Sequence, residues 1–179
     1  MLILNYVRLF IHVRLFAKHR NKEIIEADIR RWLKIYNVNL SVADGFVHLM
    51  VNYPEFRNVF YHRIDIKGGI LNLLCPKVNS LFIQTKDIGK GFFIRNGIST
   101  IVNAKSIGEN CYIDQQVILA FKRKNDLPVI ADNVTIHAGA KVLGSIVVGN
   151  NSIIKPNAVV LKDVAPGSIM EGIPAISLN

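Results

Sequence analysis

From Ile88 onward, an aliphatic residue returns at about every sixth position of this chain. Neither regular secondary structure explains this period, because a helix repeats near 3.6 residues and a strand at 2. A period of six is typical of a parallel β-helix, in which three flat faces make one coil. The sequence therefore predicts a β-helix of about four coils over residues 81–166. Its aliphatic anchors are Ile88 and Ile94, then, after one extra residue, Ile101, Ile107, Ile113 and Leu119, and finally Ile130, Ile136, Val142, Val148, Ile154 and Val160.

Each anchor is expected to point into the prism and stack on its equivalent one coil away. Small or medium residues recur four places after the anchors, where they can fill the corners of the prism. The repeat is interrupted once, over residues 120–128, and the charged residues of this stretch must leave the prism and reach solvent. The expected corner residues are Cys111, Val117, Val134, Ala140, Ser152, Ala158 and Val164.

Residues 1–80 lack the repeat, and much of this stretch shows apolar residues at helical spacing. Ser41 or Asp44 can cap one helix, and Pro54 suits the first turn of the next. We therefore expect a small α-helical domain over residues 1–80, followed by a β-helix domain over residues 81–179. Helices are expected at residues 22–36, around 46–51, at 55–64 and around 70–74.

The first segment, residues 1–20, mixes large apolar side chains with basic ones. Arg8 and Arg14 interrupt it, so it is too broken to span a bilayer, and it lacks the cleavage site of a secretory signal. Two interpretations stay open. The segment packs on the rest of the protein or on a sister subunit, or it makes a peripheral membrane contact with its basic residues at the headgroups. We expect packing, because such segments more often belong to a core.

The formal net charge of +9 invites a nucleic-acid interpretation. The basic residues are scattered between the N-terminal segment and one loop, and no nucleic-acid motif is present, so we expect no nucleic-acid partner. An anionic small molecule or an anionic membrane surface suits the charge better. Cys75 and Cys111 match neither a metal site nor a disulfide scaffold, which fits a cytoplasmic protein without a metal.

Three stretches resemble a known family. The stretch IHAGAKVLGSIVVGNNSIIKPNAVVLKDVAPGSIMEGIPA resembles the coenzyme-binding end of hexapeptide-repeat acyltransferases. The upstream blocks YPEFRNVFYHRI and IGKGFFIRNGISTIVNAKSIGENCYIDQQV resemble bacterial serine acetyltransferases and their short relatives in surface-polysaccharide gene clusters. The resemblance covers roughly residues 45–175. It implies left-handed parallel β-helices in a homotrimer, with acetyl-CoA as co-substrate in the cleft between neighbouring prisms.

The resemblance also implies where the coenzyme binds. Small residues suit the cleft because the pantetheine arm approaches the backbone closely, although the corners of a β-helix need small residues in any case. A lysine in LKDVAPG matches a position that commonly meets coenzyme A phosphates. The family usually follows its Gly-x-Pro-Ala with Lys or Arg, whereas Ile176 stands here. The implied coenzyme-binding residues are Gly139, Ala140, Ala158, Lys162 and Pro174.

The catalytic positions depart from the family. O-acetyl transfer needs a base that takes the proton of the acceptor hydroxyl. The family's catalytic His falls on Asn96, its orienting Asp near Leu81 and its second His on Leu127. An Asn amide can position a hydroxyl or stabilise an oxyanion, but it cannot act as a general base.

The replacement base can be His137, another His or the substrate itself, and His137 is the first candidate. It stands where the family usually has Gly, and it follows an inward aliphatic residue, so its side chain should point outward, toward a neighbouring prism. The alternative is an exposed or interface His without a chemical role. Asp114 is expected to be a solvated carboxylate on a turn.

Two functional hypotheses follow. The first is an acetyl-CoA-dependent O-acetyltransferase resembling serine O-acetyltransferase, with serine or a sugar hydroxyl as acceptor. The second is a catalytically inactive homologue that serves as a trimeric scaffold or regulator, because three polar catalytic positions are replaced together. Family members that bind cysteine synthase use a C-terminal tail ending in Ile. This chain has Ser177-Leu178-Asn179 there, so we expect no such complex.

Overall fold

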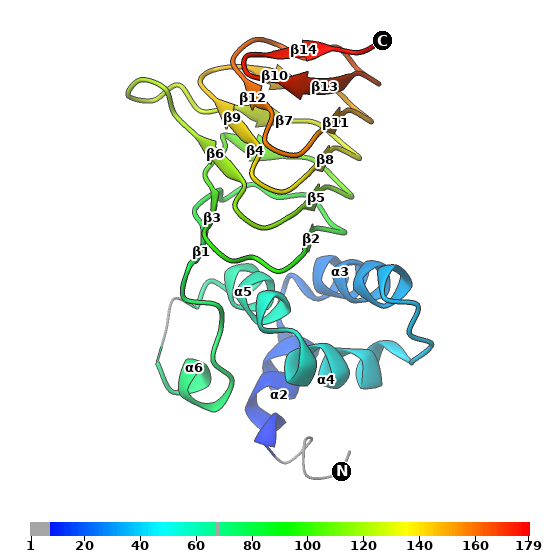
Figure 1. The fold of residues 1–179 in the computed structure, drawn as a ribbon. Helices are drawn as coiled ribbons and strands as arrows, with labels where there is room; N and C mark the ends of the chain where they lie inside the picture. The colour runs from blue at the N-terminus through cyan, green and yellow to red at the C-terminus, as the bar shows by residue number, and fades with distance from the viewer. Residues whose placement is uncertain (1–7, 67–68) are drawn as a thin grey trace. The chain divides into compact units, whose positions relative to one another are not determined.

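The computed structural model describes residues 8–66 and 69–179 (Figure 1). The chain divides into two compact units, residues 1–78 and 79–179. Within the described ranges, no helix combines the length and the apolarity that crossing a bilayer requires.

The described part of the first unit is helical, and each expected helix is present within a few residues of its expected bounds. Ser41 caps α4, because its hydroxyl accepts a hydrogen bond from the backbone N–H of Asp44 at 3.1 Å. Pro54 begins α5, where its missing N–H costs no helical hydrogen bond. The helices are α2 Phe10–Lys18, α3 Lys22–Ile35, α4 Val42–Asn52, α5 Pro54–Arg63 and α6 Ile70–Leu74.

Aromatic side chains from different helices form the core of this unit. The Trp32 ring of α3 meets the edge of Phe56 at 5.3 Å between centroids, and Phe46 of α4 meets Phe60 at 4.9 Å. One charged pair lies inside the same unit: Arg63 Nε is 2.9 Å from Asp28 Oδ2. A buried ion pair of this kind joins α3 to α5.

The N-terminal segment contributes to this core where it is described. Leu9, His12 and Phe16 are buried, and Phe16 stacks on Phe46 at 4.8 Å. This burial supports the packing interpretation of the segment. Phe10 and Ile11 are exposed on α2, so a peripheral membrane contact stays a prediction, and residues 1–7 lie outside the described residues.

Two histidines of the helical unit make its stability depend on pH. Burial lowers the pKa of His12 below its ordinary value of 6.5, and the charges of Arg8 and Arg57 lower it further. Burial also lowers the pKa of His62, with Arg63 adding to the effect. As the pH falls below the ordinary pKa, these two histidines take up protons in the unfolded chain but stay neutral in the folded unit. The free energy of unfolding of this unit is therefore full above that pKa and decreases as the pH falls through it.

We expect the urea midpoint of the helical unit to fall between about pH 8 and pH 5, and to fall less in a His12→Gln variant. The fluorescence of Trp32 measures this unit alone, because the chain has a single tryptophan. Equal pH dependence in the variant and the unaltered protein would exclude His12 as a source.

The second unit is a parallel β-solenoid of about five turns that matches the left-handed β-helix expected from the sequence (Figure 1). Its strands form three sheets, in the orders β1-β3-β6-β9-β12, β10-β7-β4 and β14-β13-β11-β8-β5-β2. The five strands of the first sheet correspond to about five turns, close to the expected number of about four. The strands are β1 Leu81–Ile83, β2 Phe93–Ile94, β3 Thr100–Val102, β4 Ser106–Ile107, β5 Tyr112–Ile113, β6 Ile118–Ala120, β7 Val129–Ile130, β8 Thr135–Ile136, β9 Lys141–Leu143, β10 Val147–Val148, β11 Ile153–Ile154, β12 Val159–Val160, β13 Ile169–Gly172 and β14 Ala175–Ser177.

The aliphatic anchors stack inside the prism as expected. Ile94, Ile113, Ile136 and Ile154 are register partners on successive strands, and all four are buried. The expected corner residues are buried as well. This arrangement explains the period of six, since each of the three faces of a coil contributes an inward aliphatic residue, and each such residue stacks on its equivalent one coil away.

One expected anchor, Ile101, is wrong. Val102 is the register partner of Leu119 and is fully buried, whereas Ile101 pairs with Ile118 and is only half-buried. The corner that precedes β3 holds Ser99 in the left-handed region at φ 52°, and this longer corner shifts the inward position by one residue. Because Ile101 and Val102 are both aliphatic, the hydrophobic pattern does not show which of the two points inward.

The stretch 120–128 leaves the prism between β6 and β7, as expected (Figure 1). Its residues 121–125 are exposed. Asp126 Oδ1 accepts a hydrogen bond from the backbone N–H of Arg123 at 2.7 Å, which closes a turn at the tip. The loop interrupts the sequence repeat but not the stacking, because β6 and β9 still pair across it.

Candidate functional site

The sheet that contains β2, β5, β8 and β11 carries a column of polar residues. In each strand, the residue that follows the inward isoleucine occupies the same place on the outer face. Register pairs Ile94 with Ile113, Ile113 with Ile136 and Ile136 with Ile154. The residues that follow these partners come from successive coils, and they are Arg95, Asp114, His137 and Lys155.

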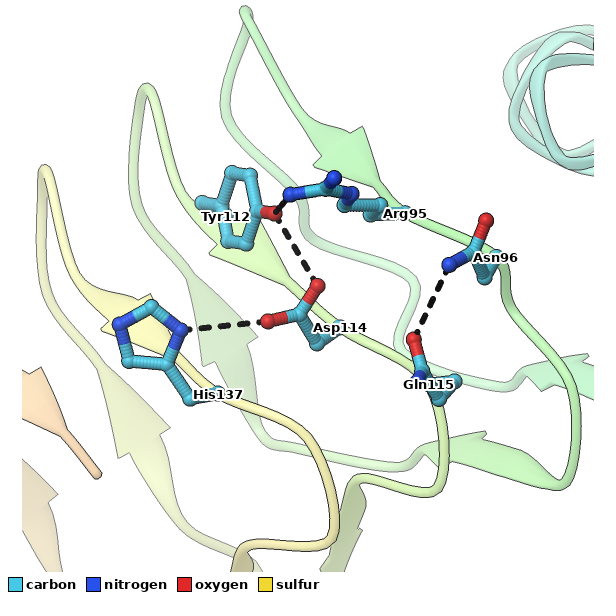
Figure 2. A network of polar contacts seen from close by, with 6 residues as sticks. All are labelled: Arg95, Asn96, Tyr112, Asp114, Gln115 and His137. Carbon is cyan, nitrogen blue, oxygen red and sulfur yellow. Dashed lines mark hydrogen bonds and ion pairs between the residues drawn. The ribbon is translucent and has the colours of Figure 1, made fainter. Parts of the chain in front are cut away.

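Asp114 and His137 form a pair in this column. His137 Nδ1 lies 3.2 Å from Asp114 Oδ2 (Figure 2). The His137 side chain is 36% exposed, whereas that of Asp114 is 13% exposed. The imidazole is thus reachable from solvent while the carboxylate beside it is largely shielded.

Tyr112 and Arg95 extend the pair into a network. The Tyr112 hydroxyl donates to Asp114 Oδ1 at 3.0 Å, and Arg95 Nη1 donates to the Tyr112 hydroxyl at 3.5 Å (Figure 2). The Tyr112 ring stacks on Phe93 with 5.1 Å between centroids. Both carboxylate oxygens of Asp114 therefore have hydrogen-bond partners within the network.

The Tyr112 hydroxyl stays a hydrogen-bond donor. Burial raises the pKa of the Tyr112 phenol, the hydrogen bond from Arg95 opposes this, and the nearby Asp114 carboxylate raises the pKa further. A protonated phenol donates its one proton, and Asp114 is the acceptor placed to receive it. The carboxylate is accordingly held at Oδ1 by Tyr112 and at Oδ2 by His137.

Asn96, the position that aligns with the family's catalytic His, lies at the exposed corner after β2. Its φ of 59° is left-handed, a conformation that Asn adopts more readily than most residues. Its Nδ2 donates to Gln115 Oε1 at 3.3 Å (Figure 2). Figure 2 therefore shows two separate hydrogen-bonded groups, Asn96 with Gln115 and His137 with Asp114. Asn96 and His137 lie two coils apart, since β5 separates β2 from β8.

The other two positions that depart from the family hold no polar side chain. Leu81 is buried in β1, and Leu127 is half-buried at the end of the loop. Neither leucine can accept a hydrogen bond or transfer a proton.

The residues expected to bind the coenzyme fall into two groups. Ala140 and Ala158 are fully buried, so their methyl groups fill corners and only their backbone can face a ligand. Gly139 has a φ of 75°, and an added Cβ would collide with the Asn157 amide, so glycine is required there. Lys162 follows β12 and Pro174 lies between β13 and β14, and both are exposed. Coenzyme binding by these residues stays a prediction.

Sequence reasoning missed Asp114. It is a partly shielded residue at the end of β5 and not a solvated turn carboxylate. The signal was present, because Asp114 follows the anchor Ile113 as His137 follows Ile136. The loop makes the two residues 23 positions apart and so hides the match. Within residues 8–66 and 69–179, no three His, Cys, Asp or Glu side chains gather to hold a metal ion.

Comparison with known proteins places this fold among the transferases. Residues 128–162, which include His137, match the family described as bacterial transferase hexapeptide (six repeats). The chain is 42% identical over 146 residues to a serine acetyltransferase of Bacillus subtilis, with 74% of this chain and 67% of that protein covered.

Two solved structures share the fold. A serine acetyltransferase of Neisseria gonorrhoeae in complex with serine superposes with a TM-score of 0.72 at 24% identity, over 93% of this chain and 72% of that one. A serine acetyltransferase in complex with CoA gives a TM-score of 0.68 at 23% identity, over 92% and 72% of the two chains.

The fold and the repeat define a hexapeptide-repeat transferase. Within that class, the chain belongs to the serine acetyltransferase family. It spans 60% of the length of a serine acetyltransferase of Synechococcus elongatus and 67% of the length of the one from Bacillus subtilis.

Proposed function

We propose that this protein transfers an acetyl group from acetyl-CoA to a hydroxyl acceptor, either serine or a sugar. The observation that carries the proposal is an outward imidazole, paired with a carboxylate, on a coil that matches the transferase repeat. Relatives named serine acetyltransferase, one of them solved with CoA and one with serine, support the donor and the reaction class.

The proposed reaction converts the thioester of acetyl-CoA into an oxygen ester of the acceptor. The acceptor hydroxyl loses its proton to a base as its oxygen attacks the thioester carbonyl, and a tetrahedral oxyanion forms. The carbon–sulfur bond then breaks, and the coenzyme A thiolate recovers a proton. His137 is the base in this scheme. Asn96 lies two coils from His137, so its amide is proposed to position a part of the acceptor remote from the reacting hydroxyl, and an amide has no usable proton affinity for the role of base.

The coenzyme is proposed to lie along the outer face of the prism. The backbone carbonyls of Gly139, Ala140 and Ala158 are proposed to accept from the pantetheine amides, because the N–H groups of these residues already donate to other backbone carbonyls. Lys162 meets the phosphates, with Pro174 nearby. A flat and self-similar face suits an extended arm, and a second prism would close the cleft. We therefore propose a homotrimer as the active assembly.

The replaced positions motivate the alternative of an inactive trimeric scaffold. Leu81 and Leu127 supply neither of the polar groups that the family uses there. The two functions differ first in whether the cleft still binds coenzyme, so binding is the property that separates them.

We expect calorimetry to show acetyl-CoA binding with one site per chain and micromolar affinity. A Lys162→Glu variant should bind at least about tenfold more weakly, since it replaces an attraction to phosphate by a repulsion. Lys122→Glu, on the exposed loop, is the matched control and should bind as the unaltered protein does. Release of free coenzyme A with serine and with a panel of sugars then identifies the acceptor. Absence of binding at millimolar coenzyme would favour the scaffold.

A further inference from the structure

We propose that Asp114 and His137 form the proton-transfer centre of this protein, two coils away from the position where the family places its catalytic His. The inference rests on the acetyl transfer proposed above. His137 is the base that contacts the acceptor, and Asp114 is a positioning residue that acts through His137.

The hydrogen bond between the two side chains selects the tautomer of the imidazole. Asp114 Oδ2 lies 3.2 Å from His137 Nδ1, and an ionised carboxylate only accepts hydrogen bonds. The neutral imidazole therefore carries its proton on Nδ1 and presents the lone pair of Nε2 to the outside. A His oriented by a carboxylate in this way is the arrangement that general-base catalysis uses in unrelated folds.

The surroundings of Asp114 keep the pair in place. Tyr112 donates to the second carboxylate oxygen at 3.0 Å, and its ring is held against Phe93. Figure 2 shows Tyr112 and His137 each reaching a different oxygen of the carboxylate. Since Asp114 has partners on both oxygens, rotation of its carboxylate would break one hydrogen bond or the other. The base is thus preorganised before any substrate binds.

Charged and titratable residues of both neighbouring coils bear on His137. Asp114 and Tyr112 belong to β5 and its end, on one side. Lys155 occupies the matching place after β11, on the other side, and Arg95 follows β2 two coils away. The Tyr112 ring lies 6.3 Å from the His137 ring between centroids, and the Asp114 carboxylate lies 3.2 Å from Nδ1. The carboxylate stabilises the imidazolium that forms when Nε2 takes the proton.

The proton moves only between His137 and the two substrates. Nε2 takes the proton of the acceptor hydroxyl as the oxygen–carbon bond forms. The resulting imidazolium returns that proton to the coenzyme A thiolate as the carbon–sulfur bond breaks. His137 ends neutral, and no other reactant is required. Adjacent strands of a sheet lie about 4.8 Å apart, so this centre stands about 10 Å along the prism from the coil of Asn96.

The test compares variants by steady-state turnover across a pH series, with acetyl-CoA and the acceptor found in the screen. His137→Gln is expected to lower kcat by about 10²–10⁴-fold and to remove the ascending limb of the pH profile. Asp114→Asn should lower kcat by about 10²-fold or more, and Asp114→Glu should restore part of the loss. The affinity for acetyl-CoA should stay unchanged in all three. Glu109→Gln is the matched acid-to-amide control, because Glu109 belongs to an exposed pair with Lys90, and it should turn over normally.

A second measurement does not depend on turnover. Nitrogen-15 NMR of the imidazoles should show a resonance for Nδ1-protonated His137, assigned by its loss in His137→Gln. In Asp114→Asn, the tautomer equilibrium should shift toward Nε2–H. An unchanged tautomer in that variant, or full turnover by His137→Gln with an unchanged pH profile, would overturn the inference and leave acetyl transfer standing. An unaltered protein that binds acetyl-CoA but acetylates no acceptor would instead overturn the proposed function, and the inference with it.

Discussion

Replacing Arg63 by methionine is expected to lower the free energy of unfolding of the helical unit by about 3–5 kcal/mol. Arg63 and Asp28 form a buried pair, with side chains only 6% and 1% exposed. Two hydrogen bonds join them, from Nε at 2.9 Å and from Nη2 at 3.3 Å. The variant leaves the Asp28 carboxylate buried without its guanidinium, which is far more costly than losing a pair in water. Urea denaturation followed by Trp32 fluorescence measures the loss.

Two further variants separate burial from charge. The double variant Asp28→Leu/Arg63→Met should recover most of the stability, because an apolar pair of similar volume carries no desolvation cost. Arg30 pairs with Glu26 at the surface, and the Arg30 side chain is 65% exposed. Arg30→Met should therefore lower the free energy of unfolding by no more than about 0.5 kcal/mol. If Arg63→Met proved as mild as Arg30→Met, the buried pair would not be what stabilises α3 against α5.

Ile154→Ala should destabilise the β-helix unit by about 2–5 kcal/mol. Ile154 is completely buried, and its register partners are Ile136 on one side and Met170 on the other. Each coil of a solenoid contacts only its neighbours, so a cavity in one coil weakens both of its interfaces. Far-UV circular dichroism in urea should show the shift, whereas the Trp32 signal of the other unit should not move.

Val147→Ala provides the control on a neighbouring strand. The Val147 side chain is 48% exposed on β10, and its truncation should cost no more than about 0.5 kcal/mol. A similar cost for the two variants would contradict the inward stacking of Ile154.

The repeat made the β-helix predictable because an aliphatic anchor returns every six positions over most of the unit, even where a second aliphatic residue precedes it, as at Ile153 and Ile154. The same rule failed at Ile101 and Val102, where two aliphatic residues are adjacent and only the backbone of the corner decides which points inward. Ser41 and Pro54 could be placed in advance because caps and first turns depend on local chemistry. The Asp28–Arg63 pair could not, since its residues lie 35 positions apart on different helices.

The candidate site was predictable in part for the same reason. His137 could be located because its direction follows from the neighbouring anchor Ile136. Asp114 could not be identified as its partner without knowing which residue lies one coil away. The interruption at residues 120–128 makes the spacing between these two coils irregular, so the sequence alone does not show it. The stacking of Tyr112 on Phe93 could not be predicted either, because it joins two coils and a single hexad does not show which residues of the next coil it contacts.

Register, and not distance along the chain, brings Asp114 to His137. The 23 positions between them contain the whole outward loop, yet β5 and β8 pair as if it were absent. The pair is therefore insulated from the length of that loop, and residues could be inserted or deleted there without moving either side chain, provided that the anchors keep step. The loop can in this sense change in length while the geometry of the pair stays fixed.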